Sequence, residues 1–172
     1  MLRLQQHQVE FVVIGGVCGI IHGVTLVTTD LDVCCRFTSE NLHRVQAALS
    51  DLHPYHRLSA NRLPFEITDE LCGRLKNLYL QTDLGKLDCL GEVAGVGSYE
   101  AVLQNSVVFN LSYGDLRILS LEAAIASKES VGRPRDLEAA KQLRAIKERT
   151  QPTNVVHCPD GQAGFPGDKI KE

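Results

Sequence analysis

Two aspartates, Asp30 and Asp32, are separated by a single residue at the start of an apolar, β-branched run. Residues two apart on a strand face the same side, so the two carboxylates are expected to project together. Carboxylates about 5–7 Å apart repel each other, and a divalent cation relieves that repulsion. Hard oxygen ligands of this kind favour Mg²⁺ or Mn²⁺. The alternative interpretation is a solvated strand start, because an Asp-Xaa-Asp triplet is common by chance.

A pair of glycines, Gly15 and Gly16, follows a short apolar run that is predicted to be a buried strand. Glycines let the backbone approach a phosphate closely, and a following helix offers unpaired N–H groups to an anion. His22, at the end of that helix, either meets a phosphate or is a buried structural histidine. Thr28 and Thr29 either support the carboxylates through their hydroxyl groups or merely suit a strand.

The elements that must position these residues can be predicted from hydrophobic periodicity and from capping and turn residues. Hairpins are expected around Gly85 and around residues 113–115, and residues 53–64 are expected to form a loop. Thr38 or Ser39, Ser98, Gly132 and Pro134 are predicted to mark helix ends. The predicted strands are 11–14, 31–37, 77–83, 86–93, 107–111 and 116–119, and the predicted helices are 1–9, 17–22, 39–52, 99–104, 121–131 and 134–148.

Length and composition fit one α/β domain with a real core. The chain has 172 residues, of which 44% are apolar and 23% charged, and it lacks Trp. We expect a domain over residues 1–150 and a flexible tail over 151–172. No apolar run reaches the length of a membrane span, and no signal peptide is evident, which predicts a cytoplasmic protein without a membrane partner.

Cysteines and charges are unevenly placed. The six cysteines include no Cys-Xaa-Xaa-Cys pair, so we expect reduced and mostly buried thiols, and His157 and Cys158 are too isolated for a metal site. Residues 30–115 carry twelve acidic and seven basic residues, whereas residues 117–149 carry eight basic and five acidic ones. This asymmetry suits a cleft with a metal on one wall and phosphates on the other; the alternative is a solvated helical face.

The segments 15–23 and 28–33, with the sequences GGVCGIIHG and TTDLDV, resemble the minimal nucleotidyltransferases of the DNA polymerase β superfamily. Within that superfamily, the AbiEii-type toxin nucleotidyltransferases and their bacterial relatives are the most similar branch. The resemblance covers about residues 9–149. It implies a short mixed β-sheet flanked by helices and transfer of NMP from an NTP to a hydroxyl group. The acceptor would be tRNA, a protein or a small molecule, and a toxin role would imply a cognate antitoxin.

The resemblance also implies a third metal-binding carboxylate on a neighbouring strand. Asp88 is the best match, because an unpaired charge between Leu87 and Cys89 would be costly unless it faced a metal or a partner. Asp83 is the rival, but it lies beside the turn at Gly85. Asp88 could also act as the general base for the attacking hydroxyl.

Lys128 and Asp136 match the family's basic helical segment. Lys128 would neutralise triphosphate charge, and its alternative is a surface lysine. Asp136, which follows Arg135, would orient Lys128 or cap its own helix. Many relatives carry an arginine shortly before the two aspartates, where this chain has Leu26. That departure motivates the alternative of a catalytically weak nucleotide-binding or regulatory module.

A third class of function, a nucleic-acid binder that uses the basic helices alone, ranks last because aromatic stacking residues are few.

Overall fold

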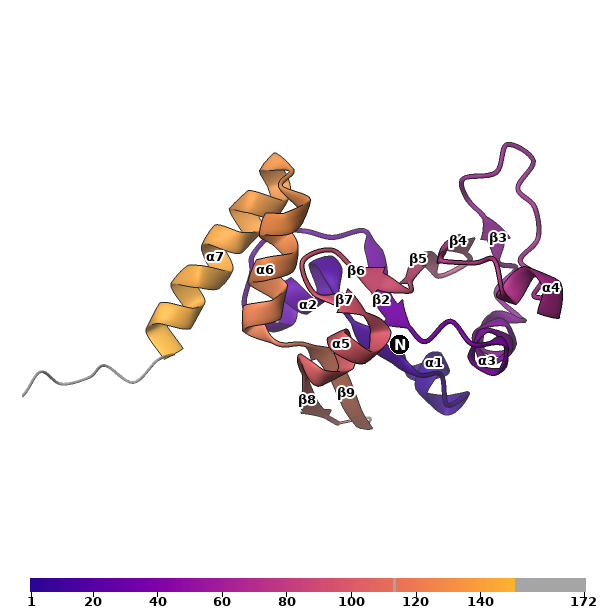
Figure 1. Cartoon of the computed structure of the whole chain (residues 1–172), viewed down its shortest axis with the longest axis horizontal. Coiled ribbons are helices and arrows are strands. Elements are labelled where there is room, and N and C mark those ends of the chain that lie inside the picture. The colour runs from indigo at the N-terminus through magenta and orange to yellow at the C-terminus, as the bar shows by residue number, and fades with distance from the viewer. Residues whose placement is uncertain (113, 151–172) are drawn as a thin grey trace, which may run out of the picture.

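A seven-stranded mixed sheet forms the framework of the protein, seen here in a computed structural model in which residues 1–112 and 114–150 are described (Figure 1). The predicted tail, with His157 and Cys158, lies outside the described residues. The helices are α1 Leu2–Gln6, α2 Gly15–Ile21, α3 Ser39–Leu49, α4 Asp69–Cys72, α5 Tyr99–Gln104, α6 Leu121–Val131 and α7 Pro134–Thr150. The strands are β1 Phe11–Val13, β2 Asp30–Cys35, β3 Tyr55–His56, β4 Asn77–Thr82, β5 Gly85–Leu90, β6 Glu92–Val93, β7 Gly97–Ser98, β8 Ser106–Leu111 and β9 Gly114–Leu119.

The strands of the main sheet follow the order β3-β4-β5-β2-β1-β9-β8. β2 pairs antiparallel with β1 and parallel with β5, and β1 is parallel to β9. The two predicted hairpins, β4–β5 and β8–β9, are antiparallel. Strands β6 and β7 form a separate two-stranded ribbon. The mixed sheet flanked by helices confirms the predicted fold class.

The sheet is buried around its centre by aliphatic side chains, as expected for a chain without Trp. Val12, Val13 and Val33 on β1 and β2 are fully buried, as are Leu42 and Val45 of α3. Each of the five cysteines in the described residues is buried and free. None of the helices described has both the length and the apolar character needed to cross a membrane.

The ends of the longer helices are fixed by local contacts. The side chains of Thr38 and Ser120 accept backbone hydrogen bonds at the starts of α3 and α6. Gly132 ends α6 with φ +69°, which lets the chain turn directly into α7. α6 and α7 pack against each other at one end of the molecule, and α3, α4 and β3 lie at the other (Figure 1).

Several predicted boundaries were wrong. The helix predicted from residue 17 begins at Gly15, so both glycines are part of its first turn. The predicted loop 53–64 contains β3, whose two residues pair with β4 and are too few to show an alternating pattern. The strand predicted over 86–93 is divided, since β5 ends at Leu90 and Glu92–Val93 form β6, which pairs with β7 and belongs to the separate ribbon.

Two short features also differ from the sequence-based expectation. Ser98 stands at the N-cap of α5, but its hydroxyl bonds to the Glu100 carboxylate at 3.0 Å instead of to the helix backbone. Helix α4 was not predicted, because one turn of helix is too short to show a 3.6-residue period.

Candidate active site

Asp32 and Asp88 are brought together by the register of the sheet. They lie directly opposite each other across the parallel strands β2 and β5, and Tyr79 lies opposite Asp88 across β4 and β5. Residues opposite each other share a face of the sheet, and Asp30, two residues before Asp32, shares it as well. One carboxylate oxygen from each of Asp30, Asp32 and Asp88 lies within 4.8 Å of the other two. The three aspartates therefore form one acidic cluster, which we call the carboxylate wall.

The backbone of Gly15 and Gly16 packs directly against this wall. Gly15 has φ +62°, and a Cβ built there would lie 2.0 Å from Oδ2 of Asp32. A Cβ on Gly16 would lie 2.4 Å from Oγ1 of Thr28, which donates a 2.8 Å hydrogen bond to Oδ1 of Asp30. The space that the missing side chains leave is thus occupied by protein groups that hold the carboxylates. Both glycines still line the cavity, so the expected approach of a phosphate to their backbone stays a prediction.

Burial and mutual repulsion disfavour the ionised forms of Asp32 and Asp88. Burial raises the pKa of Asp32, and Asp30 adds to the effect, while a hydrogen bond from the Gly16 N–H opposes it. Burial raises the pKa of Asp88 to about 6 against the opposing charge of Arg57, with Asp32 and Asp30 raising it further. Oδ1 of Asp88 is also buried without a hydrogen-bond partner. Clustered, partly unsatisfied carboxylate oxygens fit the donor set that Mg²⁺ or Mn²⁺ requires.

Arg57 is a site residue that the sequence analysis missed. It follows β3 directly, and its guanidinium donates a hydrogen bond to Oδ2 of Asp88. Its backbone N–H donates to the Tyr79 carbonyl at 3.0 Å, and its guanidinium lies 5.5 Å from the centre of the Tyr79 ring. The pairing of β3 with β4 places Arg57 beside Tyr79, and Tyr79 lies opposite Asp88 on the next strand. Two residues of strand gave no periodic signal from which this could be predicted.

The opposite side of the site is formed by the α6–α7 turn. Nζ of Lys128 donates to Oδ1 of Asp136 at 2.8 Å, and Nε of Arg133 donates to Oδ2 at 2.7 Å. Burial alone would raise the pKa of Asp136, but the hydrogen bonds from Lys128 and Arg133 outweigh it and lower the pKa. Arg135 donates to the Val27 carbonyl on the segment before β2. We call Lys128, Arg133 and Arg135 the cationic wall.

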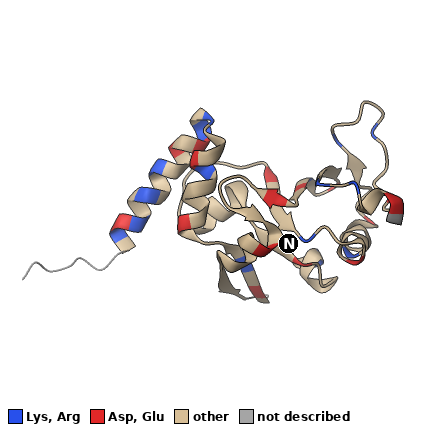
Figure 2. Ribbon diagram, viewed as in Figure 1, with Lys and Arg blue, Asp and Glu red and all other residues tan. Residues whose placement is uncertain are grey.

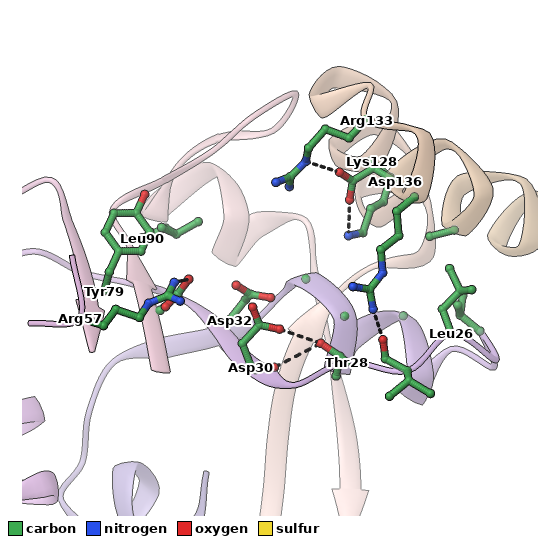
Figure 3. A pocket seen from close by; sticks show the side chains of 18 residues that line it. Leu26, Thr28, Asp30, Asp32, Arg57, Tyr79, Leu90, Lys128, Arg133 and Asp136 are labelled. Atoms are coloured by element: carbon green, nitrogen blue, oxygen red, sulfur yellow. Dashed lines mark hydrogen bonds and ion pairs between the residues drawn. The ribbon is translucent and has the colours of Figure 1, made fainter. Parts of the chain in front are cut away.

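A cavity of about 510 Å³ separates the two walls, which face each other in Figure 3. Figure 2 shows Lys and Arg along α7 and acidic residues at the start of β2. The cavity is lined by Gly15, Gly16, Gly19, Val24, Leu26, Val27, Thr28, Asp30, Asp32, Arg57, Tyr79, Asp88, Leu90, Lys128, Arg133, Arg135, Asp136 and Ala139.

Three polar residues considered in the sequence analysis lie outside this lining. Nε2 of His22 is 2.8 Å from the Leu119 carbonyl oxygen, because the ring stands at the far end of α2 from the glycines and turns toward β9. Thr29 is exposed and is not among the residues that line the cavity, although the neighbouring Thr28 is. Asp83 pairs with His53 at 2.7 Å near the β4–β5 turn.

Comparison with known proteins identifies the fold. No family model matches the chain, and no curated protein sequence matches it. Among solved structures, TM1012 of Thermotoga maritima, provisionally assigned as a nucleotidyltransferase, is 18% identical over 86% of this chain and 87% of its own, with a TM-score of 0.52. The lincosamide antibiotic adenylyltransferase LnuA, solved with lincomycin bound, is 14% identical over 83% of this chain and 90% of its own, with a TM-score of 0.56. The chain therefore has a nucleotidyltransferase fold.

Proposed function

We propose that the protein is a metal-dependent nucleotidyltransferase that moves NMP from an NTP to a hydroxyl group of an acceptor. The observation that carries the proposal is the meeting of Asp30, Asp32 and Asp88 within 4.8 Å across a cavity from Lys128. Acidic oxygens on one side and cations on the other match a triphosphate bound through a divalent ion. The fold shared with nucleotidyltransferases supports the same class of reaction.

Each wall has a separate role in this proposal. Asp30, Asp32 and Asp88 would hold Mg²⁺ or Mn²⁺, which supplies Lewis-acid stabilisation of the phosphoryl oxygens when bound. Lys128, held in place by Asp136, would stabilise negative charge on the triphosphate. Arg133 and Arg135 also line the cavity, so positive charge is available although Leu26 supplies none.

The reaction forms a bond between the acceptor oxygen and the α-phosphorus and breaks the bond between that phosphorus and the bridging oxygen. The bond electrons leave with pyrophosphate, and the proton of the acceptor hydroxyl passes to a base. Asp88 is the residue proposed as this base, because its Oδ1 is buried without a hydrogen-bond partner among the described residues.

The acceptor is proposed from three classes, which are tRNA, a protein and a small molecule. The likeness to LnuA, an antibiotic adenylyltransferase, favours including lincomycin among the small molecules to test. A role as an AbiEii-type toxin with a cognate antitoxin is the companion proposal for a tRNA or protein acceptor, and it stays a prediction from the sequence.

The test is label transfer from each of the four α-³²P-labelled NTPs, with Mg²⁺, to total tRNA, to cell protein and to lincomycin. We expect label in one acceptor class, and we expect Asp32→Ala to abolish it. Asp83→Ala is the matched control, because it removes an aspartate of the β4–β5 turn that pairs with His53 outside the cavity. Its transfer rate should equal that of the unmodified protein.

Failure of every NTP with every acceptor would count against catalysis. Calorimetry then separates the remaining functions: Mg²⁺-dependent NTP binding without transfer would identify a nucleotide-binding module. Absence of NTP binding would exclude both functions of the site.

A further inference from the structure

The ion pair between Arg57 and Asp88 lies inside the candidate metal site and has no role in the function proposed so far. The side chains are 23% and 9% exposed, so the pair is largely removed from water. Asp88 is also one of the three carboxylates that converge within 4.8 Å. A protein cation therefore already contacts an oxygen-bearing group that the proposed reaction needs for a metal ion.

The contact is incomplete on both partners. Oδ1 of Asp88 and Nε of Arg57 are buried, and neither has a hydrogen-bond partner among the described residues. A bidentate arginine–carboxylate pair would satisfy two oxygens, whereas here Arg57 reaches only Oδ2. Breaking this pair costs less than breaking a fully satisfied one, provided that another cation replaces it at Asp88.

Arg57 also has a second place to rest without a change in the backbone. Its guanidinium already lies 5.5 Å from the centre of the Tyr79 ring, whose face can accept a cation, and its N–H stays bonded to the Tyr79 carbonyl. Tyr79 lines the same cavity. If the side chain moved away from Asp88, the guanidinium would therefore lie in the cavity and keep a favourable contact with the Tyr79 ring.

Asp30 and Asp32 are held differently. Oδ1 of Asp30 accepts from Thr28 at 2.8 Å, and Asp32 accepts from the Gly16 N–H, so both are oriented by neutral donors. No lysine or arginine forms an ion pair with either aspartate among the described residues. A cation at these two carboxylates would have no protein charge to displace.

We propose that Arg57 is a built-in counter-ion of Asp88 that competes with a divalent cation for this carboxylate. Cation binding then occurs in two steps: the Asp30–Asp32 pair is available at once, whereas a cation that uses Asp88 must displace Arg57. Arg57 is thus a positioning residue that keeps Asp88 neutralised until the site is loaded. The inference rests on the proposed metal role of the three carboxylates.

The test counts Mn²⁺ ions and measures their dissociation constants by electron paramagnetic resonance and calorimetry, using Mn²⁺ alone. The unmodified protein should bind one ion tightly and a second weakly. Arg57→Gln should tighten the second ion by about 10- to 100-fold, since a charged hydrogen bond no longer competes. Arg62→Gln is the control, because this second arginine of the same loop lies over Tyr55 and forms no ion pair with a carboxylate in the part of the chain that the structure describes.

A double variant separates competition at Asp88 from a general change in charge. If Arg57 competes for Asp88, the gain from Arg57→Gln disappears in an Asp88→Asn background; if the gain persists there, the proposal fails. An unchanged or weaker second ion in Arg57→Gln would also overturn it. Arg57→Met, which keeps the aliphatic stem over Tyr79, provides the same comparison should Arg57→Gln fold poorly. Absence of Mn²⁺ binding in every variant would instead refute the metal role of the carboxylates and, with it, the proposed function.

Discussion

The two walls of the cavity hold charge in opposite ways. The carboxylate wall places three like charges close together on paired strands, where burial and repulsion raise the pKa values of Asp32 and Asp88. The cationic wall joins opposite charges across a helix turn, and its internal acid, Asp136, has a lowered pKa. The carboxylate wall, in which Arg57 pairs with Asp88 alone, thus keeps an excess of negative charge without a ligand, whereas the acid of the cationic wall is paired with two cations.

This difference indicates at which wall the binding of a ligand has the larger effect on stability and catalysis. A cation that binds the carboxylate wall relieves an unfavourable arrangement, so its binding should couple strongly to stability and to chemistry. A phosphate that binds the cationic wall must share Lys128 and Arg133 with Asp136. Changes on the first wall are therefore expected to act on turnover, and changes on the second on nucleotide affinity.

The largest effect is expected from Asp88→Asn. The amide keeps the size of the side chain but removes the negative charge and the proposed base, so kcat should fall by about 10³-fold or more. The KM for the NTP should change little, because the triphosphate contacts of the cationic wall remain. Steady-state kinetics with Asp83→Asn as the reference variant measures both; a change in KM alone would place Asp88 with nucleotide binding and contradict the division of roles.

The carboxylate wall was more accessible to prediction from the sequence than its surroundings were. Alternation on β2 put Asp30 and Asp32 on one face, which is a local argument that needs only the strand itself. The resemblance to a known family implied a third carboxylate, and the cost of an unpaired charge between two apolar residues then favoured Asp88 over Asp83. The same locality explains why most of the strands and the longer helices were predicted close to their observed bounds.

Arg57 and the packing role of Gly15 depend on contacts between segments far apart in the chain. Arg57 reaches Asp88 through the pairing of β3 with β4, and Gly15 is required because Asp32 of another element fills the space beside it. The α6–α7 turn was predicted in part, because orienting Lys128 was one of the two roles expected for Asp136. Its position across the cavity from β2 depends on how the helices pack, which periodicity does not specify.

Gly15→Ala should show how tightly the carboxylate wall is packed. Gly132 provides a matched control, because it has φ +69° beside the φ +62° of Gly15, but a Cβ there would have its nearest neighbour at 3.6 Å. Both substitutions introduce left-handed backbone strain of about 1–2 kcal/mol. Gly15→Ala should destabilise by about 2–3 kcal/mol more, since Asp32 must move. Urea denaturation measures the difference, and equal losses would mean that Asp32 shifts freely.

Lys128→Met tests the cationic wall. Methionine keeps the apolar stem but removes the charge, so the KM for the NTP should rise by about 10- to 100-fold with a smaller change in kcat. Lys141→Met on the exposed side of α7 is the control and should leave both constants unchanged. A fall in kcat with an unchanged KM would assign Lys128 to the transition state alone and weaken the contrast between the walls.

The smallest expected effect, and the most direct comparison of the walls, is the pH dependence of stability in EDTA. The pKa of Asp88 is raised from 3.8 to about 6, so its contribution is fully present below pH 3.8 and is lost as the pH rises through 6. The pKa of Asp136 is lowered, so its contribution is present above pH 3.8 and is lost as the pH falls through its folded pKa. The contribution of Asp88 should amount to about 1–2 kcal/mol, less than the full shift would give because the site is open to solvent.

Stability measured by thermal unfolding from pH 2.5 to 8 should therefore rise and then fall with pH, and the two parts of the curve should depend on different residues. Asp88→Asn should reduce the decline between pH 4 and 7, to which the raised pKa of Asp32 also contributes. Asp136→Asn should reduce the loss at the acid end, to which the lowered pKa values of Asp51, Glu100 and Glu122 also contribute. The exposed His53–Asp83 pair raises the pKa of His53 and acts in the upper window with the same sign, so His53→Gln is included to subtract it. At pH values above 6, Mg²⁺ should restore the stability that has been lost, because it binds the ionised carboxylates. A decline between pH 4 and 7 that is unchanged in Asp88→Asn would show that the charge on Asp88 costs no stability without a ligand, and the contrast between the two walls would be lost.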